Sequence, residues 1–187
     1  MLEIIGSIDA KSWIGFFGVL IGAGLGFSGV IFANISSSAR LKLQMEMEKQ
    51  HERNVIKRER LEELYVLISK WINNAFSYYF NLTLVMKGKI DYNQYLDEII
   101  EDGNSKKVDF QRIEMILNIY GRELLPLYED ILKSREKINN MASEHKNSYR
   151  EGRDCKSYIK PYSLLHKELE LQVENLKLKL AELASDI

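Results

Sequence analysis

The stretch "SWIGFFGVLIGAGLGFSGVIFANISSSAR", residues 12–40, contains no charged side chain before its last residue. A transmembrane helix needs roughly 20 apolar residues to cross about 30 Å of hydrocarbon, and a buried helix of a soluble domain rarely stays uncharged for so long. A cleaved signal peptide fits poorly, because Glu3, Asp9 and Lys11 precede the apolar run. We therefore predict an extracytoplasmic N-terminus over residues 1–11 and a transmembrane helix over residues 12–37.

Cationic residues are distributed unevenly around this helix. Only Lys11 lies just before it, whereas seven cations follow it closely: Arg40, Lys42, Lys49, Arg53, Lys57, Arg58 and Arg60. Cytoplasmic flanks of membrane helices collect Lys and Arg. We therefore expect a single-pass protein of the inner (plasma) membrane, of a bacterial type, with its N-terminus outside and its C-terminal domain in the cytoplasm.

Glycine is frequent in the apolar stretch, although it destabilises helices in water. In lipid, helices associate through close backbone approach at small residues. At about 3.6 residues per turn, six small residues fall on one face of the helix. They are Gly15, Gly18, Gly22, Gly26, Gly29 and Ala33. We predict that this glycine face, a glycine zipper, contacts another copy of the chain or another membrane protein. The alternative is that glycine is simply common in membrane helices.

The composition of the whole chain limits its partners. Its 26 Lys and Arg residues are balanced by 27 Asp and Glu residues, so its net charge of −1 provides no general attraction for nucleic acid. A single cysteine, Cys155, cannot form an internal disulfide, which agrees with a reducing cytoplasm.

The residues after the membrane stretch indicate a helical region. Residues 38–60 are charged on nearly all sides and predict a solvated juxtamembrane stalk. Residues 61–187 predict a cytoplasmic helical bundle or coiled coil, with loops near 87–91, 102–107 and 147–162. Between the first two loops, Asp91 is expected to cap a short helix that Gly103 ends.

A heptad pattern marks the next helix. Its seam includes Leu117, Leu124, Ile131 and Ile138, with Ser134 and His145 as polar interruptions. Pro126, preceded by Gly121, should kink or split this helix because proline removes a backbone hydrogen bond.

The last helix is expected to begin at a capping Ser163, and it carries two apolar stripes. One stripe comprises Leu165, Leu169, Val173, Leu176, Leu180 and Leu183, and the other comprises Leu164, Leu171 and Leu178. Two stripes require two neighbours, either earlier helices of the chain or helices of another protomer. We predict an all-α fold in which the membrane helix continues into a long cytoplasmic helix. Further helices pack with it as an antiparallel coiled-coil hairpin or a three-helix bundle.

Residues for catalysis or metal binding do not form a recognisable set. The histidines His51, His145 and His166 are far apart, and Glu48 with His51 gives only one of the two Glu-x-x-His pairs that a di-iron bundle needs. Cys155 lies in a charged stretch without the signature of a catalytic cysteine. We therefore predict a non-enzymatic protein with no catalytic residue, metal or cofactor and no evident small-molecule substrate.

The stretch "YREGRDCKSYIKPY" combines tyrosines with Arg150, Arg153, Lys156 and Lys160. Such a mixture suits nucleic acid, but the neutral chain and the membrane tether argue against that partner. If the helix ending near Asn147 descends toward the membrane, these four cations would contact anionic lipid headgroups. A solvated connector without a specific role is the alternative.

Two functional classes follow from these predictions. The favoured class is a membrane-anchored coiled-coil protein that self-associates and scaffolds or senses for a partner at the cytoplasmic face. The alternative is a membrane-perturbing effector, such as a toxin, a holin-like protein or an anti-phage defence protein, which would assemble through its glycine-rich helix.

Overall fold

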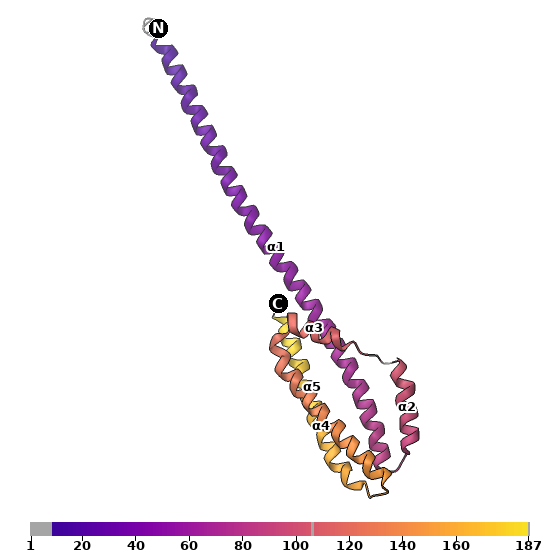
Figure 1. Ribbon diagram of the computed structural model, residues 1–187. Helices are drawn as coiled ribbons and strands as arrows, with labels where there is room; N and C mark the ends of the chain where they lie inside the picture. Colours follow the sequence, from indigo (N-terminus) through magenta and orange to yellow (C-terminus); the bar gives the residue numbers. More distant parts are fainter. Residues whose placement is uncertain (1–8, 106, 187) are drawn as a thin grey trace. The chain divides into compact units, whose positions relative to one another are not determined.

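The computed structural model describes residues 9–105 and 107–186, and this part of the chain has five α-helices and no strand. The predicted all-α fold is therefore confirmed. The helices are α1 (Ala10–Met86), α2 (Tyr92–Ser105), α3 (Phe110–Tyr120), α4 (Leu125–Arg150) and α5 (Ile159–Ser185), with short 3-10 turns η2 (Arg122–Leu124) and η3 (Lys156–Tyr158) (Figure 1). The chain divides into unit 1, residues 1–53, and unit 2, residues 54–187, and α1 contributes to both.

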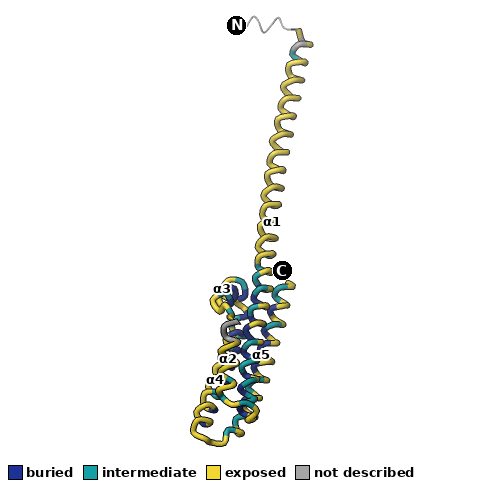
Figure 2. Tube along the Cα trace, turned by 90° about the vertical axis from the view of Figure 1, so that its right-hand side faces the viewer, coloured by how far each residue is buried: buried dark blue, intermediate teal, exposed yellow. Residues whose placement is uncertain are grey.

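Unit 1 consists, in its described part, mainly of the beginning of α1. Every residue from Ile14 to Arg53 is exposed (Figure 2). One segment of this helix is long and apolar enough to cross a membrane. Because the sequence has no proline or glycine between Ser36 and Met86, the backbone hydrogen bonds of α1 continue without a break from this segment to the helix end. Of the predicted extracytoplasmic N-terminus, residues 1–8 lie outside the described part of the chain.

A turn at Gly88 connects α1 to α2. Gly88 has a positive φ of 65°, a conformation that glycine adopts without steric cost, and this reverses the chain. The carboxylate of Asp91 then accepts hydrogen bonds from the backbone N–H groups of Asn93 and Gln94, which confirms the predicted cap of α2. Gly103, however, does not end this helix, which continues to Ser105. A single glycine costs only about 1 kcal/mol in a helix and does not by itself break one.

The predicted break near Pro126 separates two helices. Asp109 caps α3 by accepting a hydrogen bond from the backbone N–H of Arg112 at 2.9 Å, and α3 ends before Gly121. Pro126 lies in the first turn of α4, where its missing N–H has no partner to lose. The result is a split between α3 and α4 rather than a kink.

Side-chain contacts fix the helix directions in unit 2. The ring of Trp71 on α1 lies 5.8 Å from that of Tyr128 on α4, and Tyr79 donates a long hydrogen bond of 3.5 Å to Asn139 farther along both helices, so α1 and α4 run parallel. Helix α5 runs antiparallel to α1: the side chain of Lys177 lies over the ring of Tyr65, and His166 stacks on Tyr79.

The core of unit 2 lies between the inward faces of α1, α3, α4 and α5 (Figure 2). Its buried side chains recur at helical spacing of three and four, as the apolar stripes predict. Fully buried members are Leu61, Leu64, Ile68, Ile72, Ile113, Ile116, Leu117, Ile131, Ile138, Tyr162, Leu169 and Leu176.

The connector before α5 is shorter than the expected loop of residues 147–162. Helix α4 extends to Arg150, and only residues 151–155 separate it from η3. Helix α5 begins at Ile159 rather than at a capping Ser163, because Pro161 is accommodated in the first turn of the helix.

Candidate functional site

The predicted glycine face lies on the part of α1 in unit 1. A Cβ added to Gly15, Gly18, Gly22, Gly26 or Gly29 would meet nothing within 4 Å, and Ala33 is exposed. The described part of the chain therefore places no side chain or backbone against this face. Its role as a contact between helices stays a prediction.

The predicted heptad seam lies in the core of unit 2. Leu117 on α3, Leu124 in η2, and Ile131 and Ile138 on α4 are 0–2% exposed. Ser134, at 1% exposure, continues the same buried face. The seam residues therefore support the fold rather than a surface site.

The four cations predicted to contact lipid are exposed, but they occupy an unexpected position. Arg153 lies in the connector between α4 and η3, and three more cations lie on its flanks: Arg150, Lys156 and Lys160. The end of α4, next to this connector, contacts the start of α2: the ring centroids of Tyr149 and Tyr92 are 4.8 Å apart.

The connector thus lies at the end of unit 2 where α1 stops, not at the end where the chain enters at Asn54. The expectation that the helix ending near Asn147 descends toward that entry was wrong. Helix α2 already returns the chain along α1, so α4 runs in the direction of α1. A lipid contact at Arg150, Arg153, Lys156 and Lys160 stays a prediction.

An aromatic cavity in unit 2 was not predicted. It has a volume of about 350 Å³ and lies between α1, α2 and α4. Phe110 of α3, Val108 of the loop before it and Tyr162 of α5 complete the lining. Its lining residues are Trp71, Asn74, Ala75, Tyr78, Tyr79, Leu82, Tyr95, Ile99, Val108, Phe110, Arg135, Asn139, Ala142 and Tyr162. Asn139 is exposed and Phe110 is 39% exposed, so both border solvent, whereas Trp71 is only 4% exposed.

Arg135 is the only charged side chain that lines this cavity in the described part of the chain. Its guanidinium carbon lies 5.8 Å from the ring centroid of Trp71 and 5.9 Å from that of Phe110. The two rings pack edge to face, with centroids 5.7 Å apart. Among the described side chains, no carboxylate lies within ion-pair distance of Arg135. The aromatic faces stabilise the cation through their quadrupoles. A side-chain hydrogen bond also joins Arg135 to Tyr79, and this contact uses only part of the five N–H donors of the guanidinium.

Tyr162 also lines the cavity and carries a hydroxyl group. Its side chain is 1% exposed, and its Oη has no hydrogen-bond partner among the described residues. Burial raises the pKa of Tyr162 strongly, and it raises the pKa of the neighbouring Tyr95 to about 12. Both hydroxyl groups are therefore neutral near pH 7, and that of Tyr162 can donate one hydrogen bond.

A second polar cluster surrounds His145. Its Nδ1 lies 2.6 Å from the hydroxyl oxygen of Tyr92, and its ring contacts that of Tyr158. The thiol of Cys155 contacts the carbonyl oxygens of His145 and Arg153 rather than an imidazole nitrogen. These contacts give Cys155 no general base, and burial lowers the pKa of His145.

No protein family, curated protein or solved structure matches this chain. Its function is therefore argued from its own residues. Sequence reasoning missed the cavity, although Trp71 and Tyr79 belong to the buried face of α1. Asn74 and Tyr78 lie on the edge of that face and were the sequence signal for the cavity. Polar and aromatic residues beside a core face often line a pocket.

Proposed function

We propose that this protein is a non-enzymatic, single-pass membrane protein that self-associates and that scaffolds or senses for a partner through its helical unit. The observation that carries the proposal is the contrast between the two units. The apolar side chains of unit 1, among them Ile14, Phe17 and Leu20, are about half exposed or more, whereas unit 2 buries its own core.

The exposed apolar segment supports membrane insertion. Each square ångström of apolar surface left in water costs about 25 cal/mol, and a continuous helix of such side chains has no compensating contact in the described chain. Hydrocarbon covers this surface, and the unbroken helix satisfies its backbone hydrogen bonds internally. The cations that follow the segment favour a cytoplasmic position for unit 2, in the inner membrane of a bacterial-type cell.

Self-association is supported by two faces that the single chain leaves open. The glycine face of unit 1 has space beside each glycine. In unit 2, the second predicted stripe of α5 stays exposed, with Leu164, Leu171 and Leu178 at 58–65% exposure. Leucines repeated every seven residues pack well against a partner helix, which favours a second copy of the chain.

Crosslinking in native membranes tests the glycine contact. Gly22→Ile and Gly26→Ile should lower the crosslinked oligomer, because branched side chains hold neighbouring backbones apart. Gly24→Ile is the matched control: it adds the same side chain about 180° away on the helix. Assembly of all three variants at the parental level, at equal expression, would show that the glycines do not make the contact.

Membrane potential distinguishes this proposal from the membrane-perturbing effector. A scaffold or sensor should leave the potential of expressing cells intact. Rapid depolarisation on expression would instead support the effector.

A further inference from the structure

We infer that the aromatic cavity of unit 2 is a binding site for a small monocarboxylate that carries a planar aromatic ring. This inference goes beyond the proposed function and does not depend on the membrane assignment, because every residue that carries it belongs to unit 2. A bound ligand of this kind would be the signal that a sensor receives.

The walls select a planar ring. Trp71, Tyr78, Tyr79, Tyr95 and Phe110 supply aromatic surface from three sides of the cavity. Aromatic rings pair with other rings in stacked or edge-to-face geometry, and each such pair adds stabilisation beyond the burial of area. The volume of about 350 Å³ lies at the lower end of the range for small-molecule sites, which suits a compact ligand.

Arg135 selects a negative charge. Its guanidinium lies against the rings of Trp71 and Phe110, and among the described side chains it has no carboxylate partner. A planar guanidinium binds a carboxylate through two parallel hydrogen bonds. Among the described residues, the cavity lining has one positive charge, that of Arg135, and no acidic side chain. A ligand with one negative charge therefore neutralises the site, whereas a phosphate dianion leaves one negative charge unpaired.

Tyr162 supplies an unused donor. A buried hydroxyl without a partner is costly, and native proteins usually satisfy such groups. Tyr162, whose buried Oη has no partner among the described residues, lines the same cavity as Arg135. A carboxylate held by Arg135 offers further lone pairs that this hydroxyl can bind.

The test uses the full chain in lipid nanodiscs with Trp13→Phe, which leaves Trp71 as the only tryptophan. Titration with 3-phenylpropanoate should change the fluorescence of Trp71 saturably. Three probes separate the contributions: 3-phenylpropanamide lacks the charge, hexanoate lacks the ring, and phenyl phosphate carries a second negative charge. Each should bind at least about tenfold more weakly.

Two variants test the assigned residues. Arg135→Met should weaken 3-phenylpropanoate binding roughly 10- to 100-fold, and Tyr162→Phe about three- to tenfold. Lys133→Met is the control, because Lys133 lies on the same helix, is exposed and pairs with Asp130. Far-UV circular dichroism checks that each variant remains helical. If Arg135→Met unfolds, Tyr162→Phe still tests the site.

Three results would overturn the inference. The first is the absence of a saturable signal up to about 10 mM 3-phenylpropanoate with a folded chain. The second is equal binding of the neutral amide or of the phosphate. The third is an unchanged affinity in folded Tyr162→Phe, or an equal loss in Lys133→Met.

Discussion

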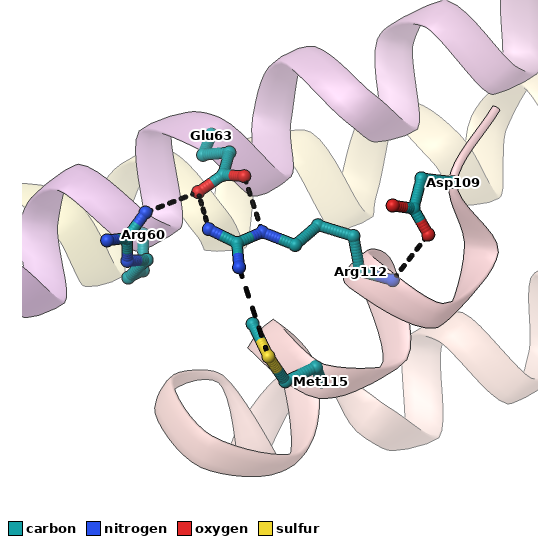
Figure 3. A network of polar contacts seen from close by, with 5 residues as sticks. All are labelled: Arg60, Glu63, Asp109, Arg112 and Met115. Carbon is teal, nitrogen blue, oxygen red and sulfur yellow. Dashed lines mark hydrogen bonds and ion pairs between the residues drawn. The ribbon is translucent and has the colours of Figure 1, made fainter.

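Glu63 on α1 accepts two hydrogen bonds from the guanidinium of Arg112 on α3, at 2.6 Å from Nε and 2.8 Å from Nη2 (Figure 3). Arg60 donates a third, also at 2.8 Å. These hydrogen bonds lower the pKa of Glu63 from 4.5 to about 2, with the bond from Arg112 as the largest cause. Glu63 and Arg112 are 49 residues apart in the sequence, and their ion pair joins α1 to α3.

The first prediction concerns acid and this ion pair. A carboxyl group whose pKa is lower in the folded state stabilises the fold above its unfolded pKa, and this stabilisation is lost as pH falls. We expect Glu63→Gln to lower the urea midpoint at pH 7, and the difference from the parent to shrink between pH 4.5 and about 2. Asp130→Asn, which removes an exposed pair within one helix, is the control. A difference that stays constant with pH would contradict the prediction.

The second prediction concerns the buried seam of α4. Ile131 and Ile138 are 0% exposed, so Ile131→Asp or Ile138→Asp should lower the free energy of unfolding by at least about 3 kcal/mol. Asn140→Asp introduces the same carboxylate at an exposed position of the same helix and should have little effect. Equal denaturant midpoints for all three variants would show that the seam is not packed.

The third prediction is that Tyr162→Phe stabilises the ligand-free protein. The substitution keeps the aromatic ring and removes a buried hydroxyl that has no partner among the described residues. The free energy of unfolding should rise by about 1 kcal/mol. A lower melting temperature would mean that the hydroxyl is satisfied, for example by a bound water.

The fourth prediction concerns His166, whose ring centroid lies 5.0 Å from that of Tyr79 and 4.3 Å from that of Tyr162. Burial lowers the pKa of His166 from 6.5 to about 4. The unfolded chain therefore binds the proton more readily, and stability should be full above pH 6.5 and fall toward pH 4. His166→Leu should reduce this slope in thermal melts. His51→Leu, at an exposed position of unit 1, should leave it unchanged.

The fifth prediction concerns topology. In a Cys155→Ser background, Ser7→Cys should react with a membrane-impermeant maleimide in intact cells, and Ser185→Cys should react only after permeabilisation. The reason is the excess of Lys and Arg after the apolar stretch. Ser7 itself lies outside the described residues. Equal protection of both positions would contradict a single pass with the C-terminus inside.

Local chemistry made parts of the fold predictable. Asp91 caps α2 because its short carboxylate reaches the first free N–H groups of a helix, wherever that helix packs. Pro126 separates α3 from α4 for an equally local reason. The burial of Ile131 and Ile138 follows from their heptad spacing, because a continuous apolar face must be covered.

The direction of α4 and the cavity were not predictable in this way. Periodicity indicates which face of a helix is buried, but not which helices cover it. Arg135 and Tyr95 lie on different helices, and each looks like an ordinary amphipathic position in the sequence. Only the return of the chain through α2 brings both to the face of α1 that carries Trp71.

The contact between the first and last helices of unit 2 has a consequence for biosynthesis. Arg58 donates a hydrogen bond to the carbonyl oxygen of Ala184, 126 residues later. At typical translation rates, the ribosome needs on the order of 10 s to make that length of chain. During this interval the apolar face of the nascent α1 from Leu61 to Met86 lacks α5, one of the helices that later cover it. Helices α4 and α5 are separated by a short connector, so they pair soon after both are synthesised, whereas the contact of α1 with α5 forms only after α2, α3 and α4 have been made.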